Sequence, residues 1–165
     1  MLAAFQQYID MPTKRPNISG HRRATDDYIH SRAGVYRCRY HIVLVTKYRR
    51  RILIGSVGSA LHEILKSVAE DQHFRILACE IGDADHVHIF IELAPGHVLT
   101  DILKHLKGRT ARRLFNRFPV LRQTVNQRHL WSPSYFVATV GVVTEATIRA
   151  YIANQHADTE EPEHS

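Results

Sequence analysis

Hydrophobic and polar positions alternate most regularly between residues 86 and 93. Successive side chains of a strand point to opposite faces of its sheet. One face of this segment is purely apolar and carries Val87, Ile89, Ile91 and Leu93. The other face carries His86, His88, Phe90 and Glu92. Two imidazoles two residues apart on a strand have Cα atoms about 6.6–6.8 Å apart, so both rings can reach one shared ion. The segment therefore predicts a strand with a candidate metal site; the alternative is two solvent-facing histidines in a chain that has 12.

Other segments have the period of a strand or of a helix. Strands are indicated by β-branched and aromatic residues, and helices by apolar residues at i, i+3, i+4 and i+7. We predict further strands over 35–47, 74–81 and 130–139, and helices over 57–71, 98–117 and 145–156. Pro133, near the start of the last strand, favours an edge position or a bulge because proline cannot donate to a sheet ladder.

The order of these elements is strand, helix, strand, strand, helix, strand and a final helix. This is the α+β, ferredoxin-like or RRM-like split βαβ pattern, an antiparallel sheet with two helices on one face. The strands at 35–47 and 86–93 would be central neighbours, and the apolar side of 86–93 would meet the helices. His86 and His88 would then lie on the open face, where we expect a ligand to bind.

The ends of the chain differ from its centre. Residues 1–33 show no sustained period and predict a poorly ordered N-terminal extension, whereas 34–156 should form one domain and 157–165 an acidic, disordered tail. No apolar run reaches the length of a membrane span, and the first residues lack the pattern of a signal peptide. Two cysteines, Cys38 and Cys79, both inside predicted strands, favour a reduced, cytoplasmic protein.

The net charge of +6 favours a polyanionic partner, with nucleic acid the leading candidate. Twelve of the 22 Lys and Arg residues fall in two short segments. They are Arg37, Arg39, Lys47, Arg49, Arg50 and Arg51, and then Lys104, Lys107, Arg109, Arg112, Arg113 and Arg117. Such clusters neutralise phosphates, and the interleaved Tyr36, Tyr40 and Tyr48 could stack on unpaired bases. The alternative is a solvated helix face beside core-facing tyrosines.

Tyr151 and Gln155 are four residues apart on the last predicted helix and so share one of its faces. Taken alone, Tyr151 has the spacing of a core tyrosine and Gln155 the place of a surface residue at a helix end.

Five motifs in a fixed order carry a resemblance to a known family. They are Tyr40-His41-Ile42-Val43 with Thr46-Lys47-Tyr48-Arg49-Arg50, then His86-Val87-His88, Leu106-Lys107-Gly108-Arg109, the segment 130–136, and Tyr151-Ile152-Ala153-Asn154-Gln155. Together they resemble the single-tyrosine HUH transposases of small bacterial and archaeal insertion sequences, TnpA-like members of the rolling-circle-nuclease superfamily. The match covers about residues 35–156. The last helix has no second tyrosine beside Tyr151, which argues against the two-tyrosine relatives.

The resemblance implies a role for each matching residue. His86, His88 and Gln155 would bind one divalent metal, either Mg²⁺ or Mn²⁺, and Tyr151 would be the nucleophile on the C-terminal helix. Attack by Tyr151 on DNA would give a 5′-phosphotyrosine and a free 3′-OH, which can rejoin strands without ATP. Because Mg²⁺ prefers oxygen ligands, two imidazoles make Mn²⁺ a credible alternative.

The resemblance also implies the partners. The DNA would be single-stranded with a hairpin near each insertion-sequence end, and the protein would be a homodimer. Gly141 would allow the final helix to be exchanged between subunits. We assign DNA contact to Arg49, Arg50, Arg51, Lys104, Lys107, Arg109, Arg112 and Arg113.

Three other functions remain open from the sequence. The first is a domesticated HUH endonuclease that acts on palindromic repeats with the same chemistry. The second is a non-catalytic ferredoxin-like RNA-binding protein, although such modules display aromatics where this strand has histidines. The third is a zinc hydrolase, in which Glu92 would be a further ligand beside the histidine pair.

Overall fold

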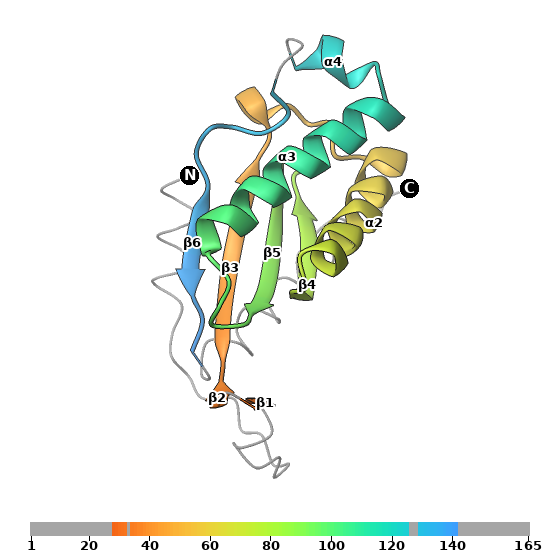
Figure 1. Ribbon diagram of the computed structural model, residues 1–165. Coiled ribbons are helices and arrows are strands. Elements are labelled where there is room, and N and C mark those ends of the chain that lie inside the picture. The colour runs from red at the N-terminus through yellow and green to blue at the C-terminus, as the bar shows by residue number, and fades with distance from the viewer. Residues whose placement is uncertain (1–27, 33, 126–128, 142–165) are drawn as a thin grey trace, which may run out of the picture.

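The computed structural model describes residues 28–32, 34–125 and 129–141. The strands are β1 (Ile29–Ser31), β2 (Gly34–Tyr36), β3 (Cys38–Val45), β4 (Arg75–Gly82), β5 (His86–Leu93) and β6 (Phe136–Thr139) (Figure 1). The helices are the 3₁₀ turn η1 (Lys47–Arg49), α2 (Gly55–Asp71), α3 (Leu99–Arg117) and the short α4 (Leu121–Thr124). None of the helices in these ranges is long and apolar enough to cross a membrane.

The main sheet has four strands in the order β4-β5-β3-β6, and each neighbouring pair is antiparallel. The predicted mixed α and β fold around an antiparallel sheet is therefore confirmed. β3 and β5 are central neighbours, and their register runs from Cys38 beside Leu93 to Val45 beside His86. His86 thus lies at the end of the sheet where β3 finishes and the basic run 47–51 begins.

Helices α2 and α3 cover one face of the sheet (Figure 1). The apolar face of β5 packs against them because its alternate residues all point that way. Fully buried members from the two layers include Ile42, Leu44, Val87, Ile89, Ile91, Leu61, Leu106 and Leu114. Burial of each such side chain contributes about 1.5–3 kcal/mol relative to exposure, so this layer is the main source of stability.

The opposite face of β5 is buried as well, which differs from the open face expected from the sequence. Phe90 is fully buried beside Val140, and Glu92 is 2% exposed. Arg39 Nε donates to Glu92 Oε2 at 2.6 Å, and Arg75 Nη1 donates to Oε1 at 3.0 Å. Both carboxylate oxygens are engaged by arginines, so Glu92 is accounted for by this buried ion pair rather than by a metal.

The two cysteines lie on β3 and β4, are half-buried and form no disulfide. Burial, with the nearby charge of Glu80 adding to it, raises the pKa of Cys79 to about 12. The thiol of Cys79 therefore stays protonated, which is the behaviour of a small packing residue.

The structure differs from the predicted elements at three places. The predicted strand 35–47 is divided at Arg37 into β2 and β3, and β2 pairs with β1 from the end of the predicted N-terminal extension. The predicted strand 130–139 forms a ladder only over 136–139. Trp131 instead makes a single bridge to Thr46. Pro133 has no N–H to continue this pairing. Helix α4 was not predicted.

Several predictions fall on residues that the structure does not describe. They are the helix over 145–156 with Tyr151 and Gln155, most of the extension over 1–33, and the tail over 157–165.

Candidate functional site

His86 and His88 lie at the start of β5, at the end of the sheet nearest to η1. Their ring centroids are 5.0 Å apart and their ring planes are inclined by 74°. The His88 residue is 8% exposed and the His86 side chain 16% exposed. The strand therefore brings the two imidazoles together in a nearly buried position, as alternation along 86–93 requires.

Each imidazole is held at its Nδ1 atom by a different neighbour. His86 Nδ1 donates to Asp85 Oδ1 at 2.5 Å, and Arg49 Nε donates to the other carboxylate oxygen of Asp85 at 2.9 Å. His88 Nδ1 lies 3.0 Å from His41 Nε2, and these two rings stack with centroids 5.2 Å apart. In this arrangement the Nε2 atoms of His86 and His88 are the atoms suited to bind a metal.

Burial keeps the inner imidazoles neutral at pH 7. It lowers the pKa of His41 to about 4. It also lowers the pKa of His88 to about 3, with further lowering by the neighbouring His41 and His86. A neutral imidazole is the form that ligates a metal, so the electrostatics at His88 suit a metal ligand.

Two imidazoles alone do not complete a metal site. Within the described ranges, no group of three His, Cys, Asp or Glu residues could hold an ion. The donor chemistry fits a divalent metal with two nitrogen ligands and a further oxygen ligand supplied from elsewhere. Gln155, the predicted third ligand, and Tyr151, the predicted nucleophile, lie outside the described residues.

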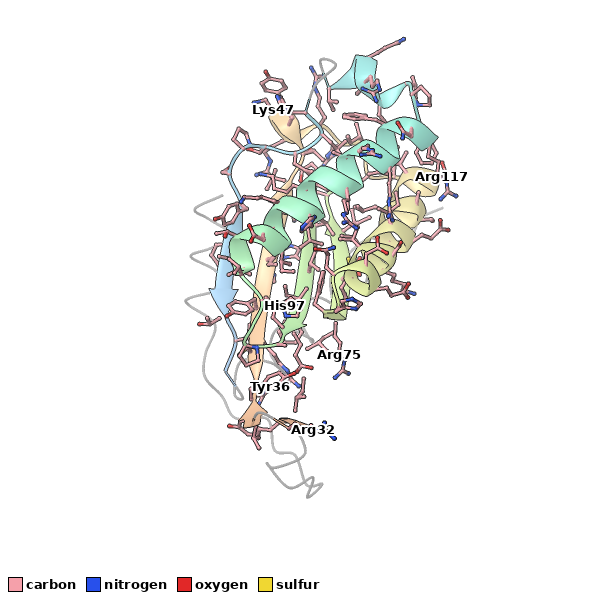
Figure 2. All side chains as sticks on the ribbon, viewed as in Figure 1. Arg32, Tyr36, Lys47, Arg75, His97 and Arg117 are labelled. Atoms are coloured by element: carbon pink, nitrogen blue, oxygen red, sulfur yellow. The ribbon has the colours of Figure 1, made fainter. Side chains whose placement is uncertain are left out.

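The basic run 47–51 lies directly beside the histidine pair. Thr46 N donates to Asp85 O at 2.8 Å, which joins the end of β3 to the start of β5. Tyr48 and Arg49 have positive φ angles of 59° and 51°, a backbone region that non-glycine residues rarely occupy. The turn places Tyr48 in solvent at 66% exposure, and Arg50 and Arg51 are also exposed. Figure 2 shows Lys47 at this end of the molecule and Arg75 near the other end of the sheet.

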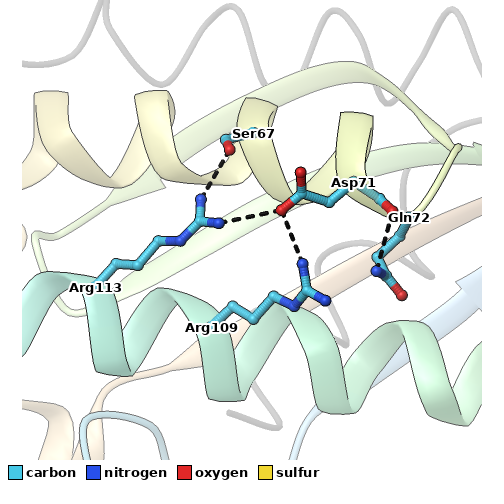
Figure 3. Close-up of polar contacts among 5 residues, drawn as sticks. All are labelled: Ser67, Asp71, Gln72, Arg109 and Arg113. Atoms are coloured by element: carbon cyan, nitrogen blue, oxygen red, sulfur yellow. Dashed lines mark hydrogen bonds and ion pairs between the residues drawn. The ribbon is translucent and has the colours of Figure 1, made fainter.

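Lys104, near the start of α3, has an exposed side chain that donates to Asp101 on the same helix. The other Lys and Arg residues of α3 divide into two groups. One group contacts α2: Arg109 and Arg113 both donate to Asp71, Arg113 also donates to Ser67 (Figure 3), and Arg117 donates to Glu63. These ion pairs are partly exposed, so each contributes only about 0.2–1 kcal/mol. Arg109 and Arg113, to which the sequence analysis assigned DNA contact, therefore join α3 to α2 through Asp71.

The second group faces α4 and the segment 129–131. Lys107, Arg112, Arg122 and His129 line a pocket of about 370 Å³ together with Gly108, Ala111, Phe115, Leu130 and Trp131. Among the residues that the structure describes, its lining contains no carboxylate. Lys107 Nζ donates to Ser132 O at 2.7 Å and to Pro133 O at 2.8 Å, and partial burial lowers the pKa of Lys107. The pocket is therefore positively charged, with Arg112 exposed at its side.

Sequence reasoning missed four residues of these two regions. Asp85 directly precedes His86, and His41 belongs to the motif Tyr40-His41-Ile42-Val43 on the central strand. Their positions in the sequence could therefore have identified both as neighbours of the histidine pair. Arg122 and His129 come from a segment without a clear period, and only the tertiary structure brings them to α3.

The fold of this chain is similar to those of solved transposase structures. The fold is that of a crystal structure assigned as a transposase from Deinococcus radiodurans R1, with a TM-score of 0.65, 40% identity, and coverage of 77% of this chain and 97% of the other. It is also similar to a REP-associated tyrosine transposase bound to a REP hairpin, with a TM-score of 0.52, 15% identity, and coverage of 86% and 72%. The fold is thus that of a transposase domain.

The family is shown by sequence. The family described as "Transposase IS200 like" matches residues 34–155. The ISDra2 transposase TnpA of Deinococcus radiodurans is 37% identical over 125 residues, covering 76% of this chain and 89% of the relative. The transposase of insertion sequence IS200 from Salmonella typhimurium is 36% identical over 120 residues, covering 73% and 78%. This chain belongs to the IS200-like transposase family and is a DNA-cleaving and strand-transferring enzyme.

Proposed function

We propose that this transposase cleaves and rejoins single-stranded DNA at insertion-sequence ends by a metal-dependent tyrosine transesterification. The observation that carries the proposal is the pair of nearly buried imidazoles at the start of β5. Their rings are 5.0 Å apart and each is held at Nδ1, so their Nε2 atoms are suited to one ion. Membership of the IS200-like family supports the reaction class.

His86, His88 and Gln155 would hold Mg²⁺ or Mn²⁺, and Tyr151 would be the nucleophile. When bound, the metal polarises the scissile phosphate and stabilises negative charge on its oxygens. The phenolate oxygen of Tyr151 attacks phosphorus, a Tyr–O–P bond forms, and the bond from phosphorus to the 3′ oxygen breaks. The phenol proton leaves and the departing 3′ oxygen takes up a proton. The linkage retains the energy of the phosphodiester, so another 3′-OH can reverse the step.

The DNA strand would run past the basic run 47–51 and on to the pocket at α3. Arg50 and Arg51 are exposed beside the histidine pair, and Tyr48 offers a ring for stacking on a base. Arg112, Arg122 and His129 would contact phosphates farther along the strand. A hairpin substrate is supported by the REP-hairpin complex of the relative with the same fold.

The enzyme would act as a homodimer that exchanges the helix over 145–156 between subunits. Gly141 is exposed and precedes that helix, so it can serve as the hinge of an exchanged arm. In this arrangement each active site combines His86 and His88 of one subunit with Tyr151 and Gln155 of its partner.

A second candidate function uses the same chemistry on another substrate. The fold is shared with a transposase bound to a REP hairpin, so a domesticated endonuclease acting on palindromic repeats is the alternative. The two functions differ in outcome: a transposase excises and inserts the DNA between two ends, whereas the alternative enzyme cuts repeats.

The test is a covalent adduct that survives denaturant. Hairpin oligonucleotides labelled at the 5′ or the 3′ end are incubated with the protein and Mn²⁺ or Mg²⁺. We expect an adduct only with the 3′-labelled piece, because the tyrosine takes the 5′ phosphate. The adduct should disappear in Tyr151→Phe and in His88→Ala. Absence of an adduct with both metals, while the protein binds RNA tightly, would contradict the proposal.

A further inference from the structure

Asp85 connects the basic run to one of the metal-ligand histidines. Its side chain is 7% exposed and accepts from His86 Nδ1 through one oxygen and from Arg49 Nε through the other. A buried carboxylate is costly unless both oxygens are satisfied, and here each has its own donor. The Arg49 side chain is 53% exposed, so the chain of contacts runs from the surface to the histidine.

The carboxylate determines which nitrogen of His86 carries the proton. An ionised carboxylate only accepts, so His86 must carry its hydrogen on Nδ1 and present the lone pair of Nε2. The short contact also fixes the direction of the ring. A second neighbour, His41 on β3, holds the ring of His88, because its Nε2 lies 3.0 Å from His88 Nδ1 across the paired strands. An imidazole can donate or accept, so this contact fixes the direction of the His88 ring and not its tautomer.

We propose that Asp85, held by Arg49, is a positioning residue that fixes the tautomer and direction of His86 for metal binding. This inference rests on the proposed metal site. It changes the role of Arg49, which the sequence assigned to DNA contact: Arg49 acts mainly through Asp85, whereas Arg50 remains free for phosphate. Because Arg49 is partly exposed, it also connects the basic run 47–51 to His86.

Arg50 provides the matched control for Arg49. The two are adjacent in the same turn and carry the same charge, but the Arg50 side chain is exposed and makes no hydrogen bond or ion pair with the residues that the structure describes. A general electrostatic effect on the site would be similar for both residues. An effect through Asp85 belongs to Arg49 alone.

The experiment measures Mn²⁺ affinity of the full chain without DNA, by electron paramagnetic resonance titration. Asp85→Asn is isosteric but leaves one carbonyl oxygen for two donors, so we expect Mn²⁺ affinity to fall about 10–100-fold. Arg49→Ala should weaken Mn²⁺ binding in the same direction by a smaller factor. Arg50→Ala should leave Mn²⁺ affinity unchanged and weaken binding of a single-stranded oligonucleotide. Circular dichroism and the melting temperature report folding for each variant.

A second measurement separates positioning from general damage. ¹⁵N NMR of the histidine rings reports which nitrogen carries the proton, and the wild-type protein should show His86 protonated on Nδ1. The Asp85→Asn variant should lose this single tautomer while the fold persists. Failure of the wild-type protein to bind Mn²⁺ would overturn the metal site and with it this inference. Mn²⁺ binding that Asp85→Asn leaves equally tight, with the same tautomer, would overturn the role of Asp85 alone.

Discussion

Glu92 and Asp71 each accept hydrogen bonds from two arginines, but they lie at different depths. The Glu92 side chain is 1% exposed and pairs with Arg39, whose side chain is 9% exposed. The Asp71 side chain is 42% exposed and pairs with Arg109 and Arg113 at the surface. A buried pair has lost its water, so removal of one partner leaves a buried charge without compensation.

The difference in burial predicts that removal of the Glu92 carboxylate costs more stability than removal of the Asp71 carboxylate. Glu92→Ala should lower the free energy of unfolding by about 3–5 kcal/mol, because the charge of Arg39 stays buried and loses the carboxylate that compensates it. Asp71→Ala should lower it by no more than about 1 kcal/mol, since both arginines remain partly hydrated. Urea denaturation at pH 7 measures both values. Equal, small losses would show that the Arg39–Glu92 pair is hydrated and that the opposite face of β5 is open.

At the scale of elements, Gly108 is an unusual residue in the middle of α3. A Cβ at this position would meet no atom of the described residues within 4 Å, so their packing does not require glycine. Gly58 on α2 is the contrast, because a Cβ there would lie 3.1 Å from Leu53 O and 3.2 Å from Ile81 Cδ1. The two helices therefore use glycine for different reasons.

Substitution of each glycine by alanine tests this difference. Gly108→Ala should stabilise the protein by about 0.5–1 kcal/mol, because alanine lowers the entropy cost of the helix and meets open space. Gly58→Ala should gain nothing or lose stability, since the new methyl meets the backbone of Leu53. Thermal melting gives the sign for each variant. A destabilised Gly108→Ala would mean that the space in front of α3 is already filled.

The elements themselves follow well from local pattern. The strand over 86–93 was predicted with the bounds that β5 has, and α2 and α3 begin within two residues of their predicted starts. Alternation and helical spacing depend only on neighbouring residues, so the sequence contains them. The division of the first strand at Arg37 and the short β6 depend on pairing with distant segments, which no local pattern records.

Less of the candidate site than of the fold could be predicted from the sequence. His86 and His88 stand out because alternation places both on one face of β5. The sequence does not show which arginines of α3 contact α2, because their acidic partners Asp71 and Glu63 lie on α2 and meet α3 only in the folded protein. The contact between Arg49 and Asp85 likewise spans 36 residues of sequence.

The whole molecule is proposed to be a dimer with exchanged final helices. In that arrangement a Tyr151→Phe subunit still offers intact histidines, and a His88→Ala subunit still offers an intact tyrosine. A mixture of the two variants should therefore regain cleavage, to about a quarter of the wild-type level if subunits mix at random. Each variant alone should be inactive. A mixture as inactive as its components would show that each subunit uses its own tyrosine.

Tyr151 is proposed to be the residue that becomes joined to DNA. Digestion of the purified adduct with trypsin should release the peptide that begins at residue 150, directly after Arg149, and contains Tyr151. Mass spectrometry should find the 5′-phosphorylated nucleotide on this peptide, at Tyr151, only in reactions that contained Mn²⁺ or Mg²⁺. A nucleotide attached to any other residue would contradict the role of Tyr151, and an adduct that forms equally well in EDTA would contradict the role of the metal.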